Sequence, residues 1–151
     1  MPDVPVDEYL CTRIRRAEQA LMAHHEAVLR GHGLTMTQYT VLLTLSREGG
    51  MSAAQLARAC GVTQQSMASV LSNLEGKRLI DRAPSPTHAK VQVATPTDEG
   101  RAVLDRAYDE VIVLERALTA AFTPAEHASL VELMERATAV LVDQTPASRS
   151  R

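Results

Sequence analysis

The chain has 151 residues, a formal net charge of −2, two cysteines and few aromatic residues, with no Trp and one Phe. This length suits a single domain, and the abundance of Leu and Ala favours helices around an aliphatic core. The two cysteines exclude a disulfide framework, and no CxxC or Cys/His spacing indicates zinc, so we expect no metal and no cofactor. No stretch approaches the roughly 20 apolar residues that span a membrane and no signal peptide is present, which predicts a cytoplasmic protein without membrane contact.

The charge is unevenly distributed along the chain. Residues 47–90 carry six basic and three acidic side chains, whereas residues 1–46 and 91–151 are each net acidic. Local positive charge of this kind suits contact with phosphates, and a dimer would double it. The middle of the chain is therefore the part to search for a nucleic-acid-binding element.

Two helices are predicted before this middle segment. The first extends from Asp7 to about Arg30 and ends at Gly31-His32-Gly33; it carries an apolar stripe at helical spacing, formed by Leu10, Ile14, Ala17, Leu21 and Val28. The second is predicted to have Thr37 as its N-cap and to end at Gly49-Gly50.

Residues 52–74 have the features of two short helices joined by a tight turn. Ser52 and Gln55 form a capping-box pattern at the start of the first helix. Gly61 permits a sharp bend, and Thr63 is a good N-cap for the second helix. This arrangement predicts a helix-turn-helix.

The second of these helices has one apolar and one uncharged polar face. The apolar face consists of Met67, Val70, Leu71 and Leu74, and the opposite face of Gln65, Ser69 and Ser72, flanked by Ser66, Ala68 and Asn73. Amides, hydroxyls and a methyl suit base edges in a major groove. The alternative is an ordinary solvated helix face, but the preceding helix, the turn and the following hairpin favour DNA.

A hairpin is predicted next. Residues 79–83 and 90–94 are strand-like, and the intervening residues 84–89 include two prolines and form a loop. A hairpin directly after a helix-turn-helix is a wing, whose tip can reach the DNA backbone or a minor groove.

Two more long helices are predicted after the wing. Thr97 is the N-cap of the first, and Thr123-Pro124-Ala125-Glu126 is a strong start for the second, which extends to about Val142. Both carry apolar residues at steps of three and four, and such long amphipathic helices need apolar partners. We therefore expect a homodimer, since two reading helices must be spaced to meet two successive major grooves; packing of these helices only on each other is the alternative.

The chain resembles the multiple-antibiotic-resistance regulator (MarR) family of winged-helix transcription factors. The resemblance is carried, in order, by Gly33-Leu34-Thr35-Met36-Thr37-Gln38-Tyr39, Leu56-Ala57, Gly61-Val62-Thr63, Leu71-x-x-Leu74-Glu75, Leu79-Ile80-Asp81-Arg82 and Thr97-Asp98-Glu99-Gly100. The resemblance implies a homodimeric transcriptional repressor. Such a repressor binds an inverted repeat in double-stranded DNA and is released from it by a small-molecule effector. The chain departs from the family pattern at His88 and Lys90, where the wing usually has Asp-x-Arg, and at Arg78, where Gly is frequent.

Together these features predict a mainly α fold with a winged helix-turn-helix at 35–95, dimerisation helices at 6–30 and 98–143, and a polar tail at 144–151, all in one domain (1–151). The residues predicted to contact DNA are Ser52, Thr63, Gln64, Gln65, Ser66, Ala68, Ser69, Ser72, Asn73, Lys77, Arg78, Arg82, Thr87, His88 and Lys90. Those predicted to form the dimer are Leu10, Ile14, Leu114, Leu118, Leu130, Met134 and Leu141.

Three alternative functions have less support in the sequence. Cys11 lies where a redox-sensing branch of the family has its reactive cysteine, and Arg15 one turn later could lower the thiol pKa, although a small core residue is the simpler interpretation. Weak overall basicity and the altered wing also suit a winged-helix module for protein–protein contact, such as an antirepressor. An enzyme is disfavoured, since no nucleophile motif or phosphate loop is present and His24-His25 and His32 are poorly arranged for a metal.

Overall fold

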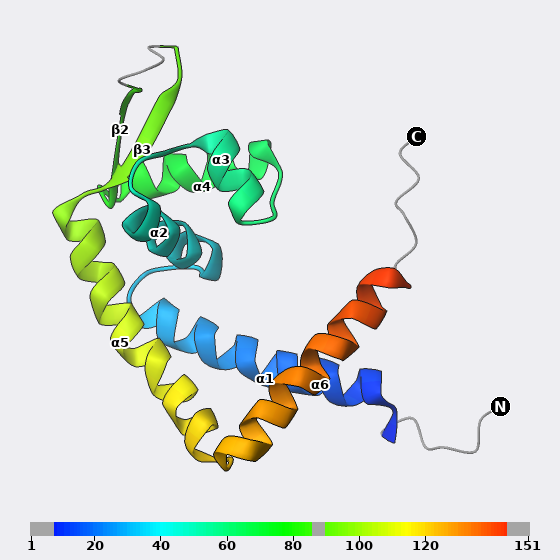
Figure 1. Ribbon diagram of the computed structural model, residues 1–151. Helices are drawn as coiled ribbons and strands as arrows, with labels where there is room; N and C mark the ends of the chain where they lie inside the picture. Colours follow the sequence, from blue (N-terminus) through cyan, green and yellow to red (C-terminus); the bar gives the residue numbers. More distant parts are fainter. Residues whose placement is uncertain (1–7, 86–89, 145–151) are drawn as a thin grey trace. The chain divides into compact units, whose positions relative to one another are not determined.

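The computed structural model describes residues 8–85 and 90–144 of the chain (Figure 1). These residues belong to two compact units, Met1–Val111 and Ile112–Arg151, and helix α5 belongs partly to each. The predicted mainly α fold is confirmed, with a small antiparallel sheet.

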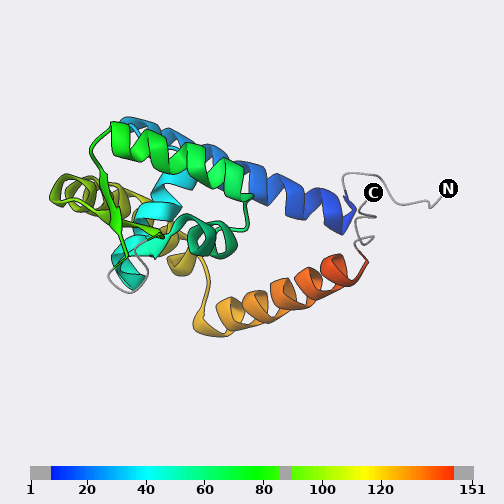
Figure 2. The ribbon, with the colours of Figure 1, turned by 90° about the horizontal axis from the view of Figure 1, so that it is seen from above.

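The described residues of the first unit form four helices, three strands and the start of a fifth helix. In chain order these are α1 (Leu10–Gly31), α2 (Met36–Glu48), β1 (Met51–Ser52), α3 (Ala53–Ala59), α4 (Gln64–Gly76), β2 (Ile80–Pro84), β3 (Gln92–Pro96) and α5 (Asp98–Ala120). α4 contacts β2 and lies beside the β2–β3 hairpin in both views of the ribbon (Figure 1, Figure 2). Helix α1 begins three residues later than predicted, and Asp7 lies outside the described residues.

The core of this unit is aliphatic, as the composition predicts. Its largest fully buried side chains come from α1, α2, α3, α4 and β2, and are Leu29, Val41, Leu42, Leu45, Leu56, Met67, Leu71, Leu74 and Ile80. Burial of each such side chain stabilises the fold by roughly 1.5–3 kcal/mol. The inner faces of α2, α3 and α4 are thereby held against one another.

Most of the predicted helix starts are confirmed. Ser52 and Thr123 form capping boxes, and the side chains of Thr63 and Thr97 accept hydrogen bonds from backbone N–H groups three residues later. The prediction for Thr37 was wrong: Thr35 is the N-cap of α2, because Gln38, three residues on, completes a reciprocal capping box.

The sheet has the order β1-β3-β2, and the predicted strand limits were wrong by one or two residues. β2 includes Pro84, which was assigned to the loop, because β2 is an edge strand and an edge position tolerates the missing N–H of proline. β3 begins at Gln92 rather than Lys90, and β1 was not predicted at all. β1 has two residues and exists only through pairing with β3, where Met51 lies opposite Ala94.

The second unit contains the last part of α5 and the whole of α6 (Pro124–Asp143). The structure describes every residue of α6, and none of them is buried. Large apolar side chains are therefore exposed along this helix. None of the helices in residues 8–85 and 90–144 is long and apolar enough to cross a membrane.

Candidate nucleic-acid interface

Helix α4 has its predicted orientation in the first unit. Met67, Leu71 and Leu74 are buried in the core, whereas Gln65 and Ser69 on the opposite face are exposed. The other predicted contacts on this helix are also exposed: Gln64, Ser66, Ala68, Ser72 and Asn73. The exposed face of α4 between Gln64 and Asn73 thus carries amide, hydroxyl and methyl groups and no charge.

Three of the predicted DNA contacts, two serines and a threonine, also have local structural roles. The Thr63 side chain accepts from Ser66 N–H over 3.1 Å, and its hydroxyl donates to Ser66 Oγ over 2.9 Å. Ser52 Oγ donates to Gln55 Oε1 over 2.8 Å. The hydroxyls of Ser52 and Thr63 are thus engaged in helix caps, and a DNA contact by either would have to share them.

A polar network that sequence reasoning missed joins the start of α2 to the end of α4. Gln38 Nε2 donates to Asn73 Oδ1 over 2.7 Å, and Lys77 Nζ donates to Gln38 Oε1 over 3.2 Å and to the carbonyl oxygen of Gly33 over 2.7 Å. Within residues 8–85 and 90–144, Gln38 is the one polar side chain that is buried, at 6% exposed. Two of the three N–H donors of Lys77 Nζ are therefore engaged in hydrogen bonds to the protein itself.

A shallow hollow lies on the outer side of the same part of α4. It is lined by Ala68, Ser69, Ser72, Asn73, Gly76 and Lys77. All six belong to α4 or its C-cap, and all of them except Gly76 are predicted DNA contacts. A ligand or a groove edge can approach this hollow closely, because two of its lining residues are Ala and Gly.

The wing contributes basic side chains, although its tip is not described. Thr87 and His88, both predicted contacts, lie outside the described residues, and Lys90 is exposed just beyond them. Arg82 lies in β2, with its Nη1 3.7 Å from Glu75 Oε2 at the end of α4. This ion pair holds the base of the wing against α4, and Arg82 remains partly exposed.

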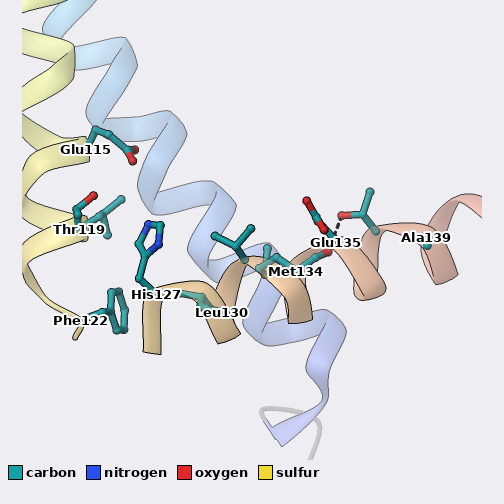
Figure 3. Close-up of a pocket in the computed structure, with 11 residues that line it drawn as sticks. Glu115, Thr119, Phe122, His127, Leu130, Met134, Glu135 and Ala139 are labelled. Atoms are coloured by element: carbon teal, nitrogen blue, oxygen red, sulfur yellow. Dashed lines mark hydrogen bonds between the residues drawn. The ribbon is translucent and has the colours of Figure 1, made fainter. Parts of the chain in front are cut away.

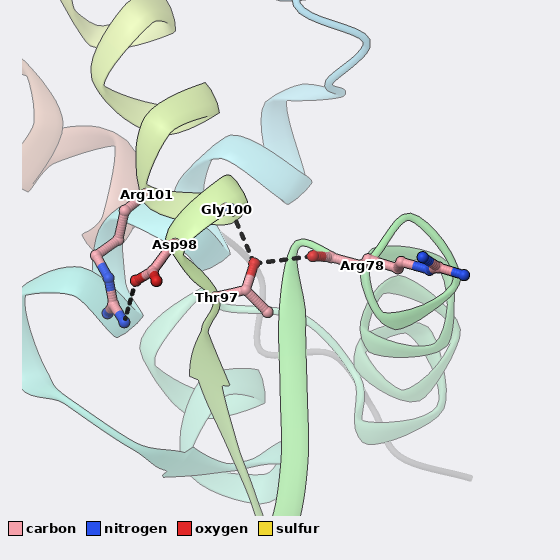
Figure 4. Close-up of polar contacts among 5 residues, drawn as sticks. All are labelled: Arg78, Thr97, Asp98, Gly100 and Arg101. Carbon is pink, nitrogen blue, oxygen red and sulfur yellow. Dashed lines mark hydrogen bonds and ion pairs between the residues drawn. The ribbon is translucent and has the colours of Figure 1, made fainter.

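Arg78 is held in an unusual backbone conformation between α4 and β2. Its φ is +59°, a left-handed value that favours glycine. Thr97 Oγ1 donates to the Arg78 carbonyl oxygen over 2.8 Å and accepts from Gly100 N–H over 2.9 Å (Figure 4). A Cβ at Gly100 would lie 1.9 Å from the Leu79 carbonyl oxygen, so only glycine fits there.

The two hydrogen bonds of Thr97 hold Arg78 in a left-handed backbone conformation that glycine would adopt with less strain. Figure 4 shows the Arg78 side chain extending away from Thr97, on the opposite side of the backbone from these hydrogen bonds. The guanidinium is therefore left exposed beside α4, while the carbonyl oxygen of the same residue is anchored to the start of α5.

Comparison with known proteins decides the family. A MarR family model matches residues 32–90, which include α2, α3, α4 and β2. The HTH-type transcriptional repressor Rv2887 of Mycobacterium tuberculosis is 31% identical over 121 residues, covering 80% of this chain and 87% of the relative. The chain belongs to the MarR family.

Other repressors are also similar to this chain. The homoprotocatechuate degradative operon repressor of Escherichia coli is 26% identical over 127 residues, which cover 83% of this chain and 85% of the relative. Among solved structures, the transcriptional repressor CouR bound to a 23-mer DNA duplex matches with a TM-score of 0.78 at 25% identity, over 91% of this chain and 98% of that one.

The second unit of this MarR-family chain contains an apolar pocket (Figure 3). Figure 3 shows Glu115 and Thr119 projecting from α5 toward the side of α6 that carries His127, Leu130 and Met134. The remaining lining residues are Leu118, Phe122, Val131, Glu135, Thr138 and Ala139. Leu118, Leu130 and Met134 are among the predicted dimer residues, and all three are exposed.

The remaining predicted dimer residues differ in exposure. Leu10 on α1 is 68% exposed and Leu141 on α6 is also exposed, whereas Ile14 and Leu114 are half-buried. Each of these side chains thus leaves apolar surface in contact with water in a single chain.

The cysteines and histidines form no chemical centre in the described residues. Cys11 is exposed on α1, and burial raises the pKa of the Cys60 thiol, although a hydrogen bond with Thr44 opposes the rise. Burial also lowers the pKa of His25. His32 Nε2 lies 3.0 Å from Glu110 Oε1, a contact between the end of α1 and α5. No group of three His, Cys, Asp or Glu side chains suited to a metal occurs in residues 8–85 and 90–144.

Proposed function

We propose that this chain is a homodimeric repressor that binds an inverted repeat in double-stranded DNA and is released by a small-molecule effector. The observation that carries the proposal is the outer face of α4, which is exposed, polar and without charge over a fully apolar inner face. Gln and Ser on such a face can hydrogen-bond to base edges, and an Ala methyl can contact thymine.

The charges around this face support DNA as the partner. Arg78 and Lys90 are exposed, and Arg82 is partly so. These basic groups follow α4 directly in the chain, so they suit the phosphates on either side of a groove that α4 enters. The DNA-bound CouR structure and the named repressors among the relatives support the same partner.

The exposed apolar side chains of α6 support a homodimer. Leu130, Met134 and Leu141 leave apolar area in water, and burial of such area between two copies is favourable by about 25 cal/mol per Å². A twofold dimer carries two α4 helices related by its symmetry axis, which suits an inverted repeat with half-sites about one DNA turn apart.

The effector proposal comes from the relatives. The Escherichia coli relative is named for the repression of a homoprotocatechuate degradative operon, so aromatic acids of that kind are the first ligands to test. An effector should weaken operator binding in proportion to its preference for the DNA-free form.

Selection from a pool of random duplexes tests the proposal. We expect enrichment of one short inverted repeat, with an affinity that falls steeply as salt is raised. Sedimentation of the complex should give two chains per duplex. If no sequence is enriched over several rounds while the chain remains folded, the proposed function is wrong.

A further inference from the structure

The neighbours of Gln38 decide which way its amide faces. Gln38 Oε1 lies 3.1 Å from the backbone N of Thr35 and 3.2 Å from Lys77 Nζ. A backbone N–H and an ammonium can donate hydrogen bonds but cannot accept them. A reversed amide would set its NH₂ group against both donors, so the oxygen has to occupy this end. The Nε2 of Gln38 must consequently face Asn73.

The orientation of the Gln38 amide determines the orientation of the Asn73 amide. Because Gln38 Nε2 can only donate, Asn73 has to turn its Oδ1 toward it, and the two atoms are 2.7 Å apart. The two N–H groups of Asn73 Nδ2 then have no acceptor within residues 8–85 and 90–144. Asn73 lines the outer hollow of α4 together with Ser69 and Ser72, so these donors are available on that side.

We propose that Gln38 is a positioning residue that makes Asn73 a donor-only contact to DNA. A freely rotating asparagine can pair with adenine through both amide atoms, using Oδ1 for N6 and Nδ2 for N7. With Oδ1 turned toward Gln38, the group that Asn73 presents to DNA is its Nδ2 donor. Its target is therefore an acceptor, either on a base (purine N7, guanine O6 or thymine O4) or on a phosphate. The proposal rests on the proposed function, since it places α4 against DNA.

The substitution Gln38→Glu reverses this polarity with little change of shape. A carboxylate still accepts from Thr35 and Lys77, and Glu is as suitable as Gln at this position of a capping box. It cannot donate to Asn73, which must turn its Nδ2 inward and present Oδ1 to the DNA acceptor. We expect operator affinity to fall about five- to tenfold, as it should in Asn73→Ala.

A double-variant cycle decides whether Gln38 acts through Asn73. We expect Gln38→Glu to cost nothing further in the Asn73→Ala background, since the contact is already gone. A displacement of the whole of α4 would instead cost the same in both backgrounds and would overturn the proposal. Unchanged operator affinity in Asn73→Ala would overturn it as well. Thermal unfolding of each variant checks that the fold is intact.

A second substitution at the same site tests the donor itself. The carboxylate of Asn73→Asp can accept from Gln38 but offers no donor to DNA. We expect it to bind the operator no more tightly than Asn73→Ala does. Parental affinity in Asn73→Asp would contradict a donor-only contact. If the parent chain selects no operator at all, that separate result refutes the proposed function and this proposal together.

Modified operators distinguish a base acceptor from a phosphate. Replacing single purines by 7-deazapurines removes N7, and replacing single phosphates by methylphosphonates removes the negative charge and one of the two non-bridging oxygens. The loss caused by Asn73→Ala should vanish on the duplex that lacks the acceptor used by Asn73. If a base is used, repeated selection with Asn73→Ala should relax the preference at that position alone. A loss that persists on every modified duplex and an unchanged preference would contradict the proposal.

Discussion

Helix α4 is exposed along one side and α6 over its whole surface, and the two exposed surfaces differ in chemistry. α4 buries Met67, Leu71 and Leu74 beneath an outer face of uncharged polar groups. All of α6 is described, and it buries no residue; its most exposed large apolar side chains are Leu133 at 55%, Val140 at 62% and Val142 at 70%.

The difference indicates that the two helices suit different partners. Exposed apolar surface is unfavourable in water, so the surface of α6 favours association with another apolar surface. The amides and hydroxyls of α4 are well hydrated, yet without charge they do little to raise solubility. Their distinctive capacity is directional hydrogen bonding, which suits base edges. A second copy of the chain thus fits α6, and DNA fits α4.

The largest expected effect is beneath α4. Leu74 is fully buried, so Leu74→Ala should destabilise the chain by about 2–5 kcal/mol through lost burial and a residual cavity. Urea unfolding monitored by circular dichroism measures the change. Ser72→Ala, on the exposed side of the same helix, is the matched control and should stay within about 0.5 kcal/mol of the parent. Equal losses in the two variants would contradict the two-sided character of α4.

The next effect concerns the apolar side of α6. Met134→Glu places a charge among apolar side chains in each copy of a dimer, so the dimer dissociation constant should rise on the order of a hundredfold. Analytical ultracentrifugation over a range of concentrations measures it. Glu132→Gln alters an exposed α6 residue outside the pocket and should leave the constant unchanged. A Met134→Glu variant with the parental association state would refute a dimer through this surface.

A smaller effect is expected on the polar side of α4. Gln65 is exposed near the start of the helix, and Gln65→Ala should cost roughly 1–3 kcal/mol of binding on the operator. Binding to a scrambled duplex should be unaffected, because that binding depends on phosphates. Fluorescence anisotropy on both duplexes gives the comparison. An equal loss on both would mean that Gln65 does not discriminate bases.

Lys90 should behave in the opposite way. It is an exposed point charge at the wing, so Lys90→Ala should weaken binding similarly on operator and scrambled duplexes. The slope of log affinity against log salt should become shallower by about 1. Lys90→Arg should bind at least as tightly as the parent. A loss confined to the operator would show that the wing reads sequence.

The smallest effect is expected at Arg78 and has opposite signs for folding and binding. Arg78→Gly relieves the left-handed backbone but adds chain entropy, for a net stabilisation of about 0.5–1 kcal/mol. It also removes an exposed charge, so operator affinity should fall and the salt slope should become shallower. Urea unfolding and anisotropy titrations measure the two quantities. A variant that is less stable than the parent would show that the Arg78 side chain itself supports the fold.

The sequence by itself determined the local structure of this protein. The caps at Ser52, Thr63 and Thr123 and the bend at Gly61 each depend on residues within a few positions, so their patterns could be recognised directly. The same holds for the apolar spacing that turns one side of α4 inward. Even the wrong choice of Thr37 had a local remedy, because Thr35 and Gln38 already form a capping-box pattern in the sequence.

Only the tertiary structure decided the features that depend on distant partners. Strand β1 forms because Met51 pairs with Ala94, and Pro84 can join β2 because that strand lies at the edge of the sheet. The orientation of Asn73 depends on Gln38, which is 35 residues earlier in the chain. Patterns in the sequence report the period of a helix or strand and its caps, whereas these contacts arise only when packing of the core brings separate elements together.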